Sequence, residues 1–279
     1  MDRIKRIRRK LTKPIIFSGI GVHTGERTNV RFLPASDGIY FTRNGRNDIK
    51  IEASIQNVVD SFHGTTIGNG TINFSMVEHI LASLFAFGID SVIIETEGGY
   101  EIPILDGSAA EIAEKLNNAV VESHMDNDND TVVIEDPFIY NNEDKFCAVY
   151  PSTKFIVSYL ISYKNYPELT QMKTIEITKD KFVTEIAPAR TYAFLEWVEP
   201  LKKHGLIKGG TLENSLVYSK DGLLNKTPLR FPDEFVRHKI LDFIGDLSLL
   251  KKRIIGHFVV LCGGHTTHIA FLKALKKVL

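Results

Sequence analysis

Two segments far apart in the chain, Val77–Leu81 and Val236–Leu241, begin in nearly the same way, each with a histidine near the start of a predicted amphipathic helix. The second segment continues to Asp242 and Asp246. Residues four apart on an α-helix lie about 40° apart around its axis, so His238 shares one helix face with both aspartates. A helix pattern used once in each half constrains the fold more than any other feature, and it hints at an ancient duplication.

The same residues suggest a metal site. Two imidazoles and one carboxylate, from His79, His238 and Asp242, are a ligand set that suits a catalytic zinc ion with one open position. Glu78, which precedes His79, could then serve as the general base for a water molecule at that site. We therefore interpret the protein as a metallohydrolase.

Each of these residues also has a plainer interpretation. A His–Asp pair four residues apart is more often a contact on a helix surface. Glu78 could be the glutamate of a capping box that starts at Ser75. Apolar neighbours define the core-facing side of the second helix, so we expect the stripe of His238, Asp242 and Asp246 to face solvent or a cleft.

Two further candidates lie in turns and at strand ends. His265 closes a Gly-Gly-His turn after a predicted buried strand, and catalytic side chains are often placed in such loops. An ordinary histidine on an exposed turn fits the sequence equally well. Thr191, at the end of Ala-Arg-Thr, carries a hydroxyl that is more often structural.

Composition limits the functional class. The 279 residues suffice for two domains, and 43% apolar with 24% charged residues is typical of a soluble globular protein. Lys plus Arg equals Asp plus Glu, at 34 each, so no net field favours nucleic acid as a partner. The acidic, aperiodic segment 124–130 is the best candidate linker, which divides the chain into domains 1–125 and 126–279.

The chain shows no sign of a membrane span. No apolar run approaches the roughly 18 residues of a spanning helix, and the basic N-terminus lacks the apolar region of a signal peptide. The basic residues near both ends predict solvated surfaces, with weak contact to an anionic membrane surface as the alternative. Only Cys147 and Cys262 occur, which fits a reducing compartment, so we expect a cytoplasmic protein.

Hydrophobic periodicity predicts an α+β fold. We predict strands at 15–17, 28–33, 49–53, 91–96, 131–134, 146–150, 155–162, 173–177 and 258–261, and helices at 76–87, 108–121, 235–250 and 267–279. Capping boxes at Ser75 and Ser108 would start the first two helices. Both halves run strands, helix, strand, helix, which favours α+β over a doubly wound sheet. Glycine-punctuated residues 193–230 fit neither half and predict an insertion.

Four more segments complete the pattern: Ser18–Glu26, Glu101–Ala109, Ala189–Thr191 and Gly264–His265. Together with the two histidine helices they run in order across almost the whole chain. The sequence resembles the UDP-3-O-acyl-N-acetylglucosamine deacetylases, zinc amidases that commit their substrate to lipid A synthesis. This resemblance implies two similar α/β-sandwich domains, each a sheet packed on helices with an insertion, and an active site at their interface.

The resemblance also implies a role for each site residue. His79, His238 and Asp242 would bind Zn²⁺, with Fe²⁺ as an alternative metal, and Glu78 would be the general base. His265 would protonate the leaving amine.

The remaining implied roles concern orientation and substrate. Asp246 would orient and charge the imidazole of His265. Thr191 would offer its hydroxyl near the developing oxyanion, and Lys239 would meet the pyrophosphate of the UDP-linked acylated glucosamine substrate. Tyr163 or Tyr166 could stack on the uracil. We further expect a monomer.

The insertion at 193–230 would build a hydrophobic passage for the acyl chain of the substrate. Phe194, Leu206 and Ile207 are candidate lining residues. About a dozen buried methylenes at ~0.8 kcal/mol each would dominate affinity before ordering costs are subtracted. The same side chains could instead form a small core of the insertion.

The chain departs from the family pattern at two positions. Cys262 stands where the family commonly has a lysine, and His268 stands where an asparagine is frequent. Two rival functions are a non-haem iron(II) oxygenase, which also uses two histidines and a carboxylate, and a non-enzymatic binding module. An oxygenase has no need for Glu78, and the zero net charge counts against a binding module that would use the basic arm.

Overall fold

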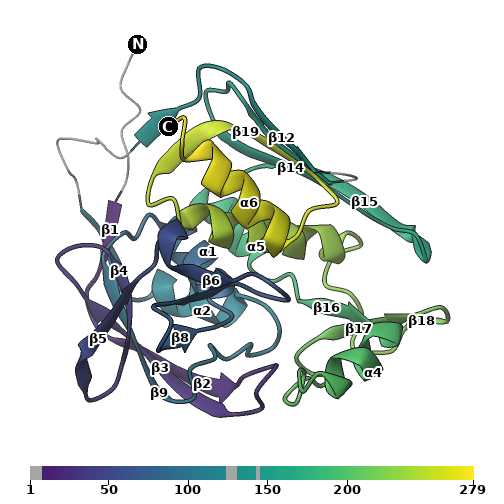
Figure 1. The fold of residues 1–279 in the computed structure, drawn as a ribbon, viewed down its shortest axis with the longest axis horizontal. Helices are drawn as coiled ribbons and strands as arrows, with labels where there is room; N and C mark the ends of the chain where they lie inside the picture. The colour runs from purple at the N-terminus through teal and green to yellow at the C-terminus, as the bar shows by residue number, and fades with distance from the viewer. Residues whose placement is uncertain (1–7, 124–130, 143–144) are drawn as a thin grey trace.

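Two β-sheets enclose a layer of helices in the computed structural model, which describes residues 8–123, 131–142 and 145–279 (Figure 1). The first sheet contains, in spatial order, β2 (Ile15–Ile20), β3 (Arg27–Pro34), β9 (Val92–Gly98), β4 (Ile39–Arg43) and β5 (Arg46–Glu52). The second contains β12 (Phe138–Asn142), β13 (Lys145–Tyr150), β19 (Arg253–Leu261), β14 (Phe155–Tyr163) and β15 (Tyr166–Glu176), with β11 (Thr131–Val133) parallel to β19.

Both sheets have the same topology. Two antiparallel hairpins flank a central strand that comes last in the sequence, β9 in one sheet and β19 in the other. The central strand runs parallel to the first strand of the second hairpin in each case. The α+β class is confirmed, and the repeated order is what a duplication would produce. The linker predicted at 124–130 lies outside the described residues, so the division into two domains stays a prediction.

Each half also contains a small three-stranded sheet between its fourth strand and its next long helix. The first consists of β6 (Val58–Asp60), β7 (Thr66–Gly68) and β8 (Asn73–Phe74), and the second of β16 (Tyr192–Phe194), β17 (Leu216–Ser219) and β18 (Gly222–Leu223). The second small sheet and α4 (Leu195–Lys203) occupy the region predicted as an insertion. They project beside the helix layer in Figure 1.

Four helices lie between the two large sheets: α1 (Glu78–Phe87), α2 (Ala110–Asn117), α5 (Glu234–Ser248) and α6 (His265–Leu275). Buried apolar side chains from both sheets and from these helices form one continuous core. Most residues of α1 and α5 are buried, including the polar Glu78, His238 and Asp242. The expected polar stripe of α5 therefore faces a buried cleft toward α1, because the neighbouring layers cover the helix on all sides.

The remaining described elements are short: β1 (Arg8–Leu11), η1 (Ile55–Asn57), β10 (Val120–Ser123), α3 (Lys179–Lys181) and η2 (Phe182–Ile186). The sequence did not predict β1, β4, β6 to β8 or β12, and it extended α2 too far, to residue 121. That end of the predicted helix instead forms β10, which pairs with β1. No helix among the described residues is long and apolar enough to cross a membrane.

The capping-box prediction for α1 is wrong. The helix begins at Glu78 after Val77, without a side-chain cap. The carboxylate of Glu78 instead accepts a hydrogen bond from the backbone N–H of Thr65, at 3.0 Å. At α2, Ser108 accepts from the backbone N–H of Ala110, one residue before the capping-box partner. Glu78 is therefore free of the helix end and available to the cleft.

Helices α1 and α5 cross at Gly245. A Cβ atom at this glycine would lie 2.2 Å from the backbone carbonyl oxygen of Glu78, far closer than atoms can approach. The missing side chain lets the start of α1 rest directly on the backbone of α5.

We predict that Gly245→Ala lowers the free energy of unfolding by about 1–3 kcal/mol, because α1 must move away to admit the methyl group. This cost exceeds the ~1 kcal/mol that alanine gains over glycine in a helix. Chemical denaturation measures the change. Gly264→Ala is the matched control, since its Cβ would meet no atom within 4 Å. Equal stabilities of the two variants would contradict the close crossing.

Candidate metal centre and catalytic site

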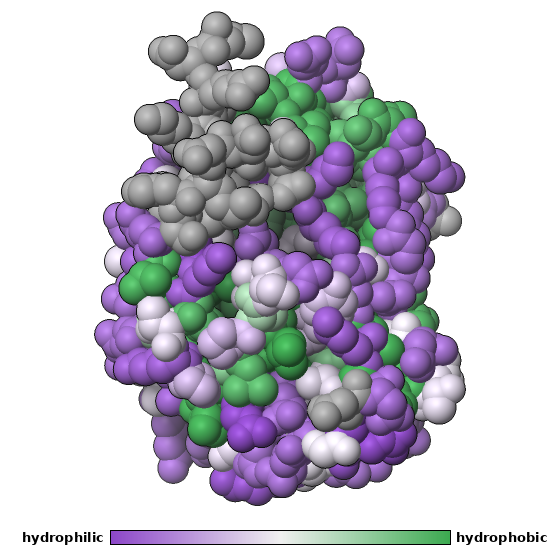
Figure 2. Space-filling view, turned by 90° about the vertical axis from the view of Figure 1, so that its left-hand side faces the viewer, coloured by the Kyte–Doolittle hydropathy of each residue, from purple (hydrophilic) through white to green (hydrophobic). Residues whose placement is uncertain are grey.

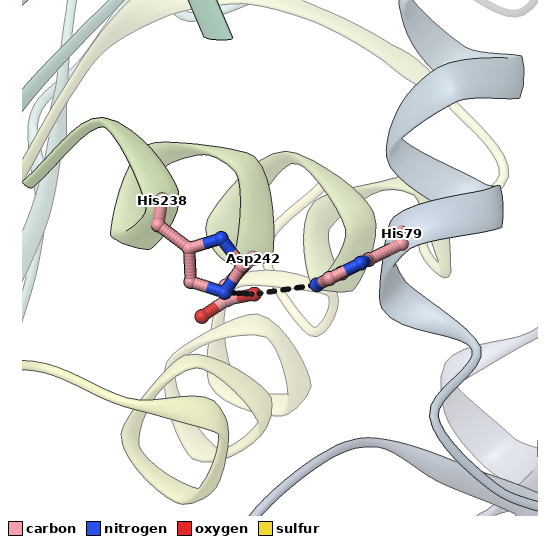
Figure 3. Close-up of side chains that lie close together, drawn as sticks. All are labelled: His79, His238 and Asp242. Atoms are coloured by element: carbon pink, nitrogen blue, oxygen red, sulfur yellow. Dashed lines mark ion pairs between the residues drawn. The ribbon is translucent and has the colours of Figure 1, made fainter. Parts of the chain in front are cut away.

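The helix crossing brings His79 of α1 together with His238 and Asp242 of α5 (Figure 3). The Nε2 atoms of His79 and His238 lie 3.7 and 3.5 Å from the same oxygen, Oδ1 of Asp242. One ligand atom from each residue lies within 4.8 Å of the other two, and all three side chains are buried. The structure thus assembles the three predicted metal ligands from the two halves of the chain.

A hydrogen bond fixes the orientation of His238. Its Nδ1 donates to the backbone carbonyl of Ala189 at 3.1 Å, which leaves Nε2 free of a proton and directed at Asp242. The neighbouring Arg190 is held by Glu234, whose Oε1 accepts from Nε at 2.8 Å. Such a partner on the far nitrogen is what orients a metal-binding imidazole.

The protonation states of these three residues are those that favour binding of a metal cation. Burial lowers the pKa of His79 to about 3 and also lowers that of His238. Burial alone would raise the pKa of Asp242, but His238, Lys239 and other neighbours hold it well below its usual value. Neutral imidazoles and an ionised carboxylate are the forms that bind a divalent metal, so the residues present fit the implied group.

Glu78 and His265 face each other beside this cluster. Oε1 of Glu78 lies 3.9 Å from Nε2 of His265, which is also 3.7 Å from Oδ2 of Asp242. Burial is the main cause that raises the pKa of Glu78 to about 7. Burial opposes protonation of His265, but Asp246 and Asp242 outweigh it and raise the pKa to about 9. Near neutral pH the pair therefore combines a proton acceptor with a proton donor.

Asp246 holds His265 from behind. Its Oδ2 accepts from Nδ1 of His265 at 2.8 Å and from Nδ1 of His268 at the same distance. Its Oδ1 accepts from the hydroxyl of Thr65. Thr65 was missed by the sequence analysis, and no sequence signal points to it, because it lies 181 residues away from its partner.

Two other groups of residues have their potential ligand atoms close together. Asp246, His265 and His268 form one, but both imidazoles already bond Asp246 through Nδ1 at hydrogen-bonding distance. The other shares Asp242 with the first cluster and contains the proton-transfer pair. His79, His238 and Asp242 are therefore the best metal centre among the described residues.

A cavity of about 160 Å³ opens onto the cluster. Thr191, Lys239 and Ile207 are among the residues that line it, and Nζ of Lys239 bonds Oδ2 of Asp242 at 2.9 Å. Trp197 and Leu201 of α4 add apolar walls. The small second sheet and its helix therefore supply one side of the site.

Three other predicted substrate residues do not line this cavity. Phe194 is buried, with its ring stacked on that of Tyr166 at a centroid distance of 4.2 Å. The Tyr163 hydroxyl lies 2.5 Å from that of Tyr192, which does line the cavity. Leu206 is half-buried and directly precedes the cavity residue Ile207 in the sequence. Their roles in substrate binding stay predictions.

Two cavity histidines were not singled out from the sequence as site residues. The rings of His23 and His63 are 6.4 Å apart, and both line the cavity. Both ring nitrogens of His23 are buried without a hydrogen-bond partner among the described residues. Glu101 orders the His23 loop by accepting from the backbone N–H groups of His23 and Thr24 at 2.8 and 2.7 Å. His63 has a positive φ of 63° in a turn that no motif marks.

A larger groove, of about 760 Å³, lies at the opposite ends of α1 and α5. Phe85, Phe155 and Ile255 form part of its apolar lining, with charged side chains around them. Figure 2 shows the side of the molecule near β1 and β4, where hydrophobic side chains gather within a mostly hydrophilic surface. None of the predicted catalytic residues lines this groove.

Fold and site together define an enzyme whose buried histidine and aspartate cluster could hold a metal ion between two similar sheet-and-helix halves. The chain belongs to the UDP-3-O-acyl N-acetylglycosamine deacetylase family, whose model matches residues 8–277.

Named relatives agree with this family. The UDP-3-O-acyl-N-acetylglucosamine deacetylase of Thermodesulfovibrio yellowstonii is 42% identical over 266 residues, which cover 94% of this chain and 89% of the relative. The enzyme of the same name from Geobacter sp. is 39% identical, over 89% of this chain and 82% of its own. That of Chlamydia felis is 37% identical and covers 96% of both chains. The resemblance seen in the sequence is confirmed.

We predict that His79→Ala or His238→Ala weakens metal binding by more than about 100-fold, since even partners behind the ligands contribute 10–100-fold. Metal analysis of the protein after dialysis against a weak chelator measures the loss. His257→Ala is the control, because this histidine of β19 bonds Ser158 outside the cluster. Full metal content in both ligand variants would exclude the proposed centre.

Proposed function

We propose that the protein is a zinc-dependent amidase that removes the N-acetyl group from UDP-3-O-(3-hydroxyacyl)-N-acetylglucosamine, giving the free amine and acetate. The family match over nearly the whole chain supports the substrate class. The observation that carries the chemistry is the buried cluster of His79, His238 and Asp242 with Glu78 and His265 beside it. This reaction is the committed step of lipid A biosynthesis.

His79, His238 and Asp242 would hold the metal, with Zn²⁺ as the proposed ion and Fe²⁺ as the alternative. A bound zinc ion would polarise the acetyl carbonyl and make a water molecule more acidic. The carboxylate donor and two imidazoles leave room for such ligands in a catalytic site.

Proton transfer falls to Glu78 and His265. With a pKa of about 7, Glu78 can accept the proton that water loses as its oxygen adds to the acetyl carbon. With a pKa of about 9, His265 is protonated near neutral pH and can give its proton to the amine nitrogen as the C–N bond breaks. The two transfers balance, and the products are acetate and the free amine.

Neighbouring side chains would place the substrate. Thr191 lines the cavity and would hydrogen-bond the oxyanion that forms on the acetyl group. Lys239, whose pKa is raised by Asp242 and Tyr163 against the effect of burial, would meet the pyrophosphate. Trp197, Leu201 and Ile207 offer an apolar wall where the acyl chain could enter from the insertion.

The free thiols of Cys147 and Cys262 support a cytoplasmic location as part of this proposal. We also propose that the chain acts as a monomer, since both halves of the metal site come from one polypeptide.

We predict that Glu78→Gln keeps the bound metal and lowers kcat by about 10²–10⁴-fold, because the amide cannot accept a proton. Acetate release from the UDP-linked substrate and metal analysis of the same sample check both parts. Glu114→Gln, at an exposed position of α2, serves as the control for a general charge effect. Loss of metal together with activity would argue against a general base.

We also predict inhibition by a hydroxamate, a bidentate zinc-binding group, when it carries a long apolar tail. The bare hydroxamate should bind at least about 100-fold more weakly, since each buried methylene contributes ~0.8 kcal/mol. Competition with substrate in the acetate assay measures both compounds. Equal inhibition by the two compounds would still support a metal site but would contradict the proposed acyl passage.

A further inference from the structure

The carboxylate of Asp246 serves two histidines. His265 and His268 are three residues apart on α6 and therefore project from the same side of the helix. Both donate from Nδ1 to the same oxygen, Oδ2 of Asp246, at 2.8 Å. The other oxygen accepts from Thr65. His265 has a role in the proposed proton transfer with Glu78. His268 belongs neither to this pair nor to the candidate metal ligands.

The direction of each hydrogen bond follows from chemistry. Asp246 is ionised and can only accept, so both imidazoles carry a proton on Nδ1. Burial lowers the pKa of His268, which leaves its Nε2 unprotonated. That nitrogen lies 2.9 Å from the hydroxyl of Tyr159, which must donate to it. An ordered chain thus runs from Tyr159 through His268 and Asp246 to His265.

The chain is enclosed. Tyr159, His268 and Asp246 are fully buried. The ring of Phe243 packs edge-on against that of His268, at a centroid distance of 5.2 Å. A Cβ at Gly263 would lie 3.2 Å from the Tyr159 hydroxyl and 3.3 Å from Nε2 of His268. The imidazole of His268 cannot rotate without losing its hydrogen bonds to Asp246 and Tyr159, so the arrangement has one stable geometry.

We propose that His268, oriented by Tyr159, is a positioning residue for the proton donor His265. It donates to Oδ2 of Asp246, the same oxygen that accepts from His265, and so holds the carboxylate that directs Nε2 of His265 toward Glu78 and Asp242. This inference deepens the proposed function and rests on it.

Two amide variants separate positioning from general damage. In His268→Asn the amide nitrogen can take the place of Nδ1 and still donate to Asp246. In His268→Gln it reaches the place of Nε2, beside Tyr159, and leaves Asp246 without this donor. Both variants have similar polarity, so each controls for the loss of the ring in the other.

We expect zinc-loaded His268→Asn to keep kcat within about threefold of the natural protein. His268→Gln should lose about 10- to 100-fold in kcat with KM and metal content unchanged, as for other residues that orient a site. Tyr159→Phe should lose about 3- to 10-fold, because the Nε2 partner is gone. Equal kcat values in the Asn and Gln variants would overturn the proposal. If neither variant folds, the kcat of Tyr159→Phe tests the proposal instead, and an unchanged kcat would overturn it.

Proton NMR of the ¹⁵N-histidine-labelled zinc protein gives a readout apart from turnover. The low-field Nδ1–H signals should include one from His265 and one from His268, and His268→Gln should shift the one from His265. An unmoved His265 signal would overturn the positioning role. Absence of acetate release from the natural protein, with both signals present, would instead reject the proposed function and leave the hydrogen-bond chain intact.

Discussion

The close crossing of α1 and α5 at Gly245 is the contact on which the site depends. The glycine lets the Glu78 backbone rest on α5, so His79 reaches the oxygen of Asp242 that also faces His238. A side chain there would separate the two halves of the metal centre, because each half supplies part of it. The repeated sheet topology places equivalent helices back to back and makes this meeting possible.

Charge is concentrated where the helices meet. Glu78, Asp242 and Asp246 are buried in one cluster with Lys239 and the histidines of the site, where isolated charges would be very unfavourable. Hydrogen bonds from Thr65, Lys239 and the histidines offset that cost. The same environment moves the pKa values of Glu78 and His265 toward the states that amide hydrolysis needs. Stability and catalysis therefore rest on one network.

The sequence predicted the elements that depend on local pattern. The long helix α5, most strands of the two large sheets and the three candidate metal ligands follow from hydrophobic period and residue spacing. The short strand β4 was missed, because it lies against the distant strand β9, with which it pairs in parallel. The capping box at Ser75 was wrong, since Glu78 bonds Thr65, a partner that only the folded chain brings near.

The sequence by itself determined the family, the α+β class and the identity of the candidate catalytic groups, because the motifs occur in order and each carries its own chemistry. Only the tertiary structure decided how these groups are oriented. The tautomer of His238, the shared oxygen of Asp246 and the place of Thr65 depend on residues 49, 22 and 181 positions apart. Such contacts arise from tertiary packing within the second half and between the two halves, and no local pattern in the chain encodes them.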